Sequence, residues 1–123
     1  MRAVVGVAVA GALGALARYG VGAAINHRFT NFPWGTLVVN VTGSFLLGLL
    51  FVVLTERSTA SAVLRSALTI GFVGAYTTFS TFSFETVRLL EDGALGAAAW
   101  NVLASVVIGL GAAWLGIATG RAL

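Results

Sequence analysis

Residues 71–84 read Gly-Phe-Val-Gly-Ala-Tyr-Thr-Thr-Phe-Ser-Thr-Phe-Ser-Phe, and they lie in the middle of a long apolar stretch. Five serine and threonine hydroxyls alternate there with three phenylalanines, Phe79, Phe82 and Phe84. Such hydroxyls gain nothing by facing lipid, because hydrocarbon offers no partner for their hydrogen bonds. We therefore expect this segment to face protein, water or an ion, and the rest of the chain to frame it.

The composition indicates an integral membrane protein. The chain has 123 residues, of which 59% are hydrophobic and only 9% are charged, whereas soluble domains average about 25% charged residues. It has no cysteine, a single histidine (His27) and four carboxylates, which leaves little for acid–base or metal-assisted catalysis. The arginines are scattered rather than clustered, so no nucleic-acid partner is indicated. We expect no enzyme.

Four apolar segments are long enough to cross a hydrocarbon core of roughly 30 Å. They cover about residues 3–25, 34–54, 64–90 and 94–119, with short polar connections. In the last of them, Ala112, Gly116 and Gly120 form a small-residue stripe that is suited to close helix packing. The segments are too long and too continuously apolar for barrel strands, so helices are expected. The sequence predicts an all-α membrane protein in which residues 1–123 form a single four-span domain.

Three features of the first two spans leave alternatives open. Met1-Arg2, the apolar run and Ala15-Leu-Ala17 also fit a secretory signal peptide, although a transmembrane span is the preferred interpretation. Arg18 either snorkels toward water or meets a partner inside the protein. Asn40 shares one helical face with Gly43 and Ser44, and ordinary interhelical hydrogen bonding explains it well when it is taken alone.

The phenylalanines of the third span allow two interpretations. Phe79 and Phe82 are neighbours on a helix, because they are three residues apart. Aromatic ring edges carry partial positive charge, so two rings presented edge-on can receive an anion without a full positive charge nearby. The alternative is that both rings only pack against neighbouring helices.

The arginines give no clear orientation in the membrane. Arg2, Arg57, Arg65 and Arg121 lie at the end that holds the termini, and Arg28 and Arg88 lie at the other end, with Arg18 nearest to them. The positive-inside rule needs an excess on one side, and none exists here. Two outcomes therefore stay open: other features set a single topology, or the chain inserts in both directions. Two opposed copies could then pair antiparallel, and a pore would be shared between them.

Three segments together resemble the CrcB (Fluc) family of fluoride ion channels. They are Gly11–Tyr19, Gly35–Gly48 and Gly71–Glu85, and the resemblance extends over all four spans in order. The string Thr-Thr-Phe-Ser-Thr-Phe in a third span is its most specific part. The resemblance implies an antiparallel, dual-topology homodimer in the inner (plasma) membrane of a prokaryote, which lets fluoride leave the cytoplasm passively.

The resemblance also implies residue roles. It assigns the fluoride path to ring edges, an amide, three hydroxyls and a vestibule carboxylate: Phe79, Phe82, Asn40, Ser80, Thr81, Ser105 and Glu85. It assigns a central structural Na⁺ to the backbone carbonyls of Gly74 and Thr77, at a break in the third helix. This chain departs from many relatives at Asn101, where they carry a tyrosine.

Two other classes of function compete with a channel. A small four-span, proton-coupled exporter of the multidrug type needs a carboxylate embedded in the membrane, and Glu85, toward the end of the third span, is the nearest candidate. A structural membrane subunit without transport would leave the row of hydroxyls unexplained. Electrogenic flux that needs no proton gradient separates the channel from both alternatives.

The arginine balance generates a test of orientation. A tag at the C-terminus should be accessible from both faces of one membrane, because neither end of the chain has the charge excess that fixes topology. Protease or thiol-reagent accessibility of the tag in sealed vesicles measures this. A tag that is found on one face only contradicts dual topology.

Overall fold

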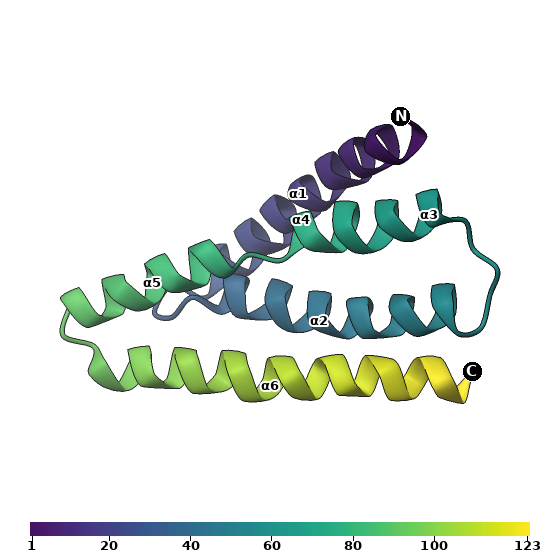
Figure 1. The fold of residues 1–123 in the computed structure, drawn as a ribbon. Helices are drawn as coiled ribbons and strands as arrows, with labels where there is room; N and C mark the ends of the chain where they lie inside the picture. Colours follow the sequence, from purple (N-terminus) through teal and green to yellow (C-terminus); the bar gives the residue numbers. More distant parts are fainter.

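The computed structural model describes residues 1–123 and is entirely helical (Figure 1). Four helical segments are long and apolar enough to cross a membrane, and they confirm the four-span prediction: Arg2–Arg28, Trp34–Thr55, Ala62–Glu91 and Leu95–Ala122. The helices in chain order are α1 (Arg2–Arg28), α2 (Trp34–Thr55), α3 (Ala62–Ser66), the π-helix η1 (Ala67–Val73), α4 (Gly74–Tyr76), α5 (Phe79–Glu91) and α6 (Leu95–Ala122). The chain is thus a multi-pass membrane protein.

The first helix is longer than the sequence suggested. We expected a loop from Asn26, but α1 continues to Arg28, and Phe29 N still donates to Ile25 O at 3.0 Å. The Asn26 side chain accepts a hydrogen bond from Gly35 N at 3.1 Å. Asn26 therefore belongs to the helix and satisfies a backbone donor in the first turn of α2, which such turns otherwise leave unpaired.

The helices α2 and α6 lie side by side along their length (Figure 1), and glycines allow the close approach. A Cβ on Gly116 would lie 2.1 Å from Phe45 O, and a Cβ on Gly48 would lie 2.3 Å from Ala113 O. Gly120 is similarly close to Val52. These contacts confirm the small-residue stripe expected in the fourth span.

The first helix packs against the third span in the same manner. A Cβ on Gly14 would lie 2.2 Å from Phe72 O, and one on Gly71 would lie 2.8 Å from Val7 O. The small residues of α1 therefore allow the N-terminal half of the third span, and η1 in particular, to pack closely against this helix.

The third span is interrupted near its middle. The π-helix η1 leads into α4, which ends at Tyr76. Thr77 (φ −84°, ψ 159°) and Thr78 (φ −154°, ψ 109°) are extended, and α5 begins at Phe79. This is the position at which the resemblance implied a break.

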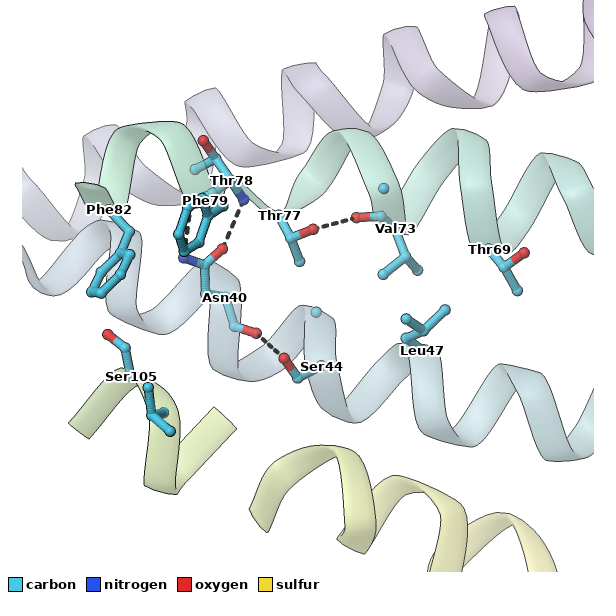
Figure 2. A pocket seen from close by; sticks show the side chains of 13 residues that line it. Asn40, Ser44, Leu47, Thr69, Val73, Thr77, Thr78, Phe79, Phe82 and Ser105 are labelled. Carbon is cyan, nitrogen blue, oxygen red and sulfur yellow. Dashed lines mark hydrogen bonds between the residues drawn. The ribbon is translucent and has the colours of Figure 1, made fainter. Parts of the chain in front are cut away.

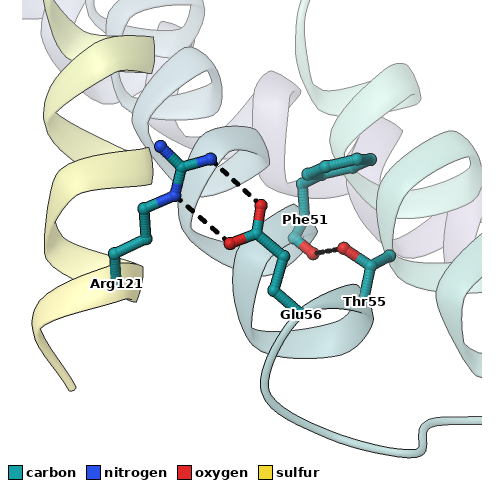
Figure 3. A network of polar contacts seen from close by, with 4 residues as sticks. All are labelled: Phe51, Thr55, Glu56 and Arg121. Atoms are coloured by element: carbon teal, nitrogen blue, oxygen red, sulfur yellow. Dashed lines mark hydrogen bonds and ion pairs between the residues drawn. The ribbon is translucent and has the colours of Figure 1, made fainter.

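At the end that holds both termini, an ion pair joins the last turn of α6 to the end of α2 (Figure 3). Arg121 Nε and Nη2 donate to the two carboxylate oxygens of Glu56 at 3.2 and 3.1 Å, and Arg57 Nη1 donates to Arg121 O at 3.0 Å. The hydrogen bonds from Arg121 lower the pKa of the Glu56 carboxyl. Both side chains are exposed, so the pair adds little to stability.

The α2–α6 contact generates a stability prediction. Gly116→Ala should destabilise the protein by about 1–3 kcal/mol, because its new methyl group must displace the backbone of α2. Gly111→Ala is the matched control on the same helix, since no atom lies within 4 Å of its Cβ position. Thermal unfolding of both variants in detergent measures the difference, and equal melting temperatures would show that α2 and α6 accommodate the methyl group without cost.

Candidate ion pathway at the break in the third span

The break is held by the side chain of Asn40 (Figure 2). Asn40 Nδ2 donates to Thr78 O at 3.0 Å, and Thr78 N donates to Asn40 Oδ1 at 2.7 Å. One amide thus satisfies both backbone groups of an extended residue inside the membrane, where unpaired groups are costly. Its second Nδ2 hydrogen is not needed for this pairing.

The helix restarts on the hydroxyl of Thr78. Thr78 Oγ1 accepts from Thr81 N at 3.2 Å, which makes Thr78 the N-cap of α5. The same hydroxyl lies 2.9 Å from Thr81 Oγ1 and 3.3 Å from Ser80 Oγ. Part of the hydroxyl string therefore builds a helix terminus, whose exposed N–H groups favour negative charge.

The break also changes the partners of the preceding carbonyls. In a continuous α-helix Thr78 N would donate to Gly74 O, but here it donates to Asn40. Thr77 N and Thr77 Oγ1 both donate to Val73 O, at 3.0 and 3.1 Å. The carbonyl of Gly74 thus loses its regular helical partner, and Gly74 is exposed in the single chain.

A cavity of about 320 Å³ lies beside the break, and we call it the break cavity (Figure 2). No side chain that lines it is charged. The lining residues come from α2, the third span and α6: Asn40, Gly43, Ser44, Leu47, Thr69, Val73, Gly74, Thr77, Thr78, Phe79, Phe82, Ser105 and Val106.

Two rings and one hydroxyl shape one part of the break cavity. The centroids of Phe79 and Phe82 are 5.7 Å apart and the rings are tilted by 48°. Phe79 is 78% exposed, so its ring is not held as core packing. Ser105 Oγ is buried and has no hydrogen-bond partner, and Figure 2 shows it beside Phe82. Buried polar groups in native proteins are normally paired, so this hydroxyl is available to a ligand.

A second cavity, of about 340 Å³, contains Glu85, and we call it the Glu85 cavity. Thr36 Oγ1 donates to Glu85 Oε1 at 2.8 Å, while Glu85 Oε2 is buried without a partner. Arg18 lines the same cavity and forms no ion pair, so neither earlier explanation of Arg18 is decided. Thr78 lines both cavities and stands between them.

The comparison with known sequences agrees with this geometry. A family model described as "CrcB-like protein, Camphor Resistance (CrcB)" matches residues 5–117. The chain belongs to the CrcB family.

Several relatives of this CrcB chain carry the name "Fluoride-specific ion channel FluC". One from Citrifermentans bemidjiense is 52% identical over 124 residues, and one from Geobacter metallireducens is 51% identical over 125 residues; both alignments cover 100% of each chain. A third, from Agrobacterium fabrum, is 48% identical over 118 residues, which is 95% of this chain and 94% of the relative.

The structure brings most of the predicted CrcB site residues together. The break cavity contains Asn40, Phe79, Phe82, Ser105, Gly74 and Thr77, whereas Thr81 and Glu85 line the Glu85 cavity and Ser80 lines neither. Asn101 lies outside both.

Sequence reasoning missed two residues of this site. Thr78 was treated as one of several hydroxyls, but it caps α5 and separates the cavities. A threonine directly before the first apolar residue of a helical segment, here Phe79, is a usable N-cap signal. Thr36 was not singled out, and its bond to Glu85 has no local signal because 49 residues separate the two.

The Asn40 pairing generates a prediction. Asn40→Leu should lower the stability of this CrcB chain, because Thr78 N–H and C=O lose their partners at a cost of about 1–3 kcal/mol for each buried group. Ser44→Ala is the control, since Ser44 Oγ bonds only the Asn40 carbonyl of its own helix, at 2.7 Å. Thermal melts followed by circular dichroism compare the two. If both variants melt alike, the break does not depend on the amide.

Proposed function

We propose that this protein is a fluoride-selective channel that conducts passively and lowers cytoplasmic fluoride. The observation that carries the proposal is the break cavity, whose lining side chains are all uncharged. Two tilted phenylalanine rings, an unpaired serine hydroxyl and the amide of Asn40 on α2 line this cavity beside the start of α5. The relatives named as fluoride-specific ion channels support the choice of anion.

The donor set suits a small, strongly hydrated anion. Such an ion enters a membrane only if donors replace its water, and conduction also requires that the ion leave again. Ring edges, hydroxyls and the positive end of a helix attract an anion without the deep energy well of a buried arginine. In this structure, Phe79, Phe82 and Ser105 supply the first two kinds of group around one cavity.

The exposure of the break supports the proposal of an antiparallel homodimer. Gly74 and Phe79 are both exposed in the single chain, although the break lies in the middle of the segment Ala62–Glu91. Non-helical backbone is tolerated at membrane depth only where protein covers it or water reaches it. We propose that a second, inverted copy covers this face, and that each pore is lined by both copies in a bilayer of lipid.

The proposed Na⁺ fits the groups at the break. Gly74 O has lost its helical donor and Thr77 is extended, so both carbonyls can turn toward the dimer axis. Carbonyl oxygens released from broken helices are hard ligands of the kind that hold alkali cations. The chain offers no cluster of His, Cys, Asp and Glu to hold another metal. Bound there, Na⁺ would supply a positive charge that attracts the carbonyl oxygens of both copies and so holds the copies together.

The proposed location is the inner (plasma) membrane of a prokaryote. Fluoride enters such cells as the weak acid HF and ionises in the less acidic cytoplasm, so the anion accumulates there. A passive pathway then lowers the internal concentration, because the anion flows down its own gradient.

The alternative is a small proton-coupled exporter, and one observation gives it weight. Glu85 is a partly buried carboxylate whose Oε2 has no partner, and exporters use such groups to exchange protons for substrate. A channel carries fluoride electrogenically without a proton gradient. Efflux from liposomes at equal internal and external pH therefore decides between the two.

A ring substitution separates the pore from packing. Phe82→Ile roughly preserves apolar volume, and such swaps usually cost under about 1.5 kcal/mol, but it removes the positive ring edge. In liposomes that hold the purified protein, we expect wild-type fluoride efflux to exceed chloride efflux clearly. The Phe82→Ile variant should remain folded and lose most of its fluoride efflux.

The control for this experiment is the elution volume in gel filtration, which must match the wild type. Normal efflux from an intact Phe82→Ile protein would mean that the rings only pack. An absence of fluoride efflux from the wild type would overturn the proposed function itself.

A further inference from the structure

Asn101 is among the most buried polar residues of the chain, although it lies outside both cavities. It is 2% exposed, and its Nδ2 donates to Thr86 Oγ1 at 2.9 Å. Asn101 lies on α6 and Thr86 on α5, and no other side-chain hydrogen bond joins these two helices. The bond therefore ties the second half of the third span to the last helix.

The bond continues into the backbone of a cavity residue. Thr86 Oγ1 donates its one hydrogen to Phe82 O at 2.8 Å, so the same oxygen must accept from Asn101. The path runs from the amide of Asn101 through Thr86 to the carbonyl of Phe82. Hydrogen bonds in such a chain polarise and strengthen one another.

The packing around α5 makes this bond important for position. No residue of α5 is buried, so few apolar contacts hold the helix in place. Ser105 lies four residues after Asn101, on the same face of α6, and it lines the break cavity with Phe82. Fixing α5 at Asn101 thus fixes the separation between the Phe82 ring and the unpaired Ser105 hydroxyl.

We propose that Asn101 is a positioning residue, which acts through Thr86 to hold Phe82 opposite Ser105 in the anion path. The inference rests on the proposed function of the break cavity, but it concerns residues that do not line that cavity. Its consequence is that two apolar substitutions outside the pathway slow the flux of fluoride.

The test uses three variants and a control on the intact chain. Asn101→Leu removes the donor at similar volume, Thr86→Val removes the hydroxyl, and Thr86→Ser keeps it. Thr119→Val is the matched control, because Thr119 Oγ1 also bonds the carbonyl four residues earlier, Leu115 O, at 2.8 Å, but accepts from no other side chain. Fluoride efflux from liposomes and thermal stability in detergent are measured for each.

We expect Asn101→Leu and Thr86→Val each to slow fluoride efflux by roughly threefold to tenfold, the range that corresponds to the loss of one interhelical hydrogen bond in a membrane. The double variant should be no slower than the slower single variant, because both changes break one path. It should also regain stability over Thr86→Val, since that single variant leaves the buried Asn101 amide without its acceptor. Thr86→Ser and Thr119→Val should conduct like the wild type.

Slow efflux from a double variant that has regained stability would show that the pair positions the pathway rather than merely stabilising the fold. The inference is overturned if the single variants conduct at the rate of Thr119→Val, or if their losses add in the double variant. If the wild-type protein shows no fluoride efflux, the proposed function is overturned, and with it the role of Asn101 in the pathway. The thermal comparison then tests only whether Asn101 and Thr86 pair.

Discussion

The pairing between the Asn40 amide and the backbone of Thr78 is the constraint on which the rest of the structure depends. A transmembrane helix can open in its middle only if another group takes the place of its lost hydrogen bonds, and here one side chain provides both partners. This arrangement requires α2 to lie directly against the break. Gly43 meets that requirement, because a Cβ there would lie 2.2 Å from Thr77 Cγ2. The glycine seam between α2 and α6 in turn holds α2 in place.

The parts of the fold that local pattern determines were predictable, and those that depend on a distant partner were not. Continuous apolar runs predicted four spans, and the spacing of Gly116 and Gly120 predicted a close contact. The break has no proline to mark it, and neither Thr77 nor Thr78 alone would end a helix. Its partner, Asn40, lies 38 residues earlier in the chain. Only the resemblance to a family indicated that the break exists.

The candidate site was predicted unevenly for a related reason. The resemblance implied that Asn40 and Ser105 belong to the fluoride path, but it could not show that Asn40 already pairs with the backbone or that the Ser105 hydroxyl has no partner. The hydroxyls of the third span looked alike in sequence. Capping takes the hydroxyl of Thr78, and Ser80 lines neither cavity, so position relative to the helix terminus separates roles that composition cannot.

The π-helix η1 gives the third span a rotational offset. Each of its turns encloses one residue more than an α-helical turn, and Gly74 N accordingly donates to Thr69 O, five residues earlier. If the same seven residues, Ala67–Val73, adopted regular α-helix instead, everything beyond them would be turned by about 100° relative to α3. Thr78 would then face away from Asn40, although every residue of the site was still present. The π-helical conformation of this segment, and not only its residues, is therefore part of what places the break.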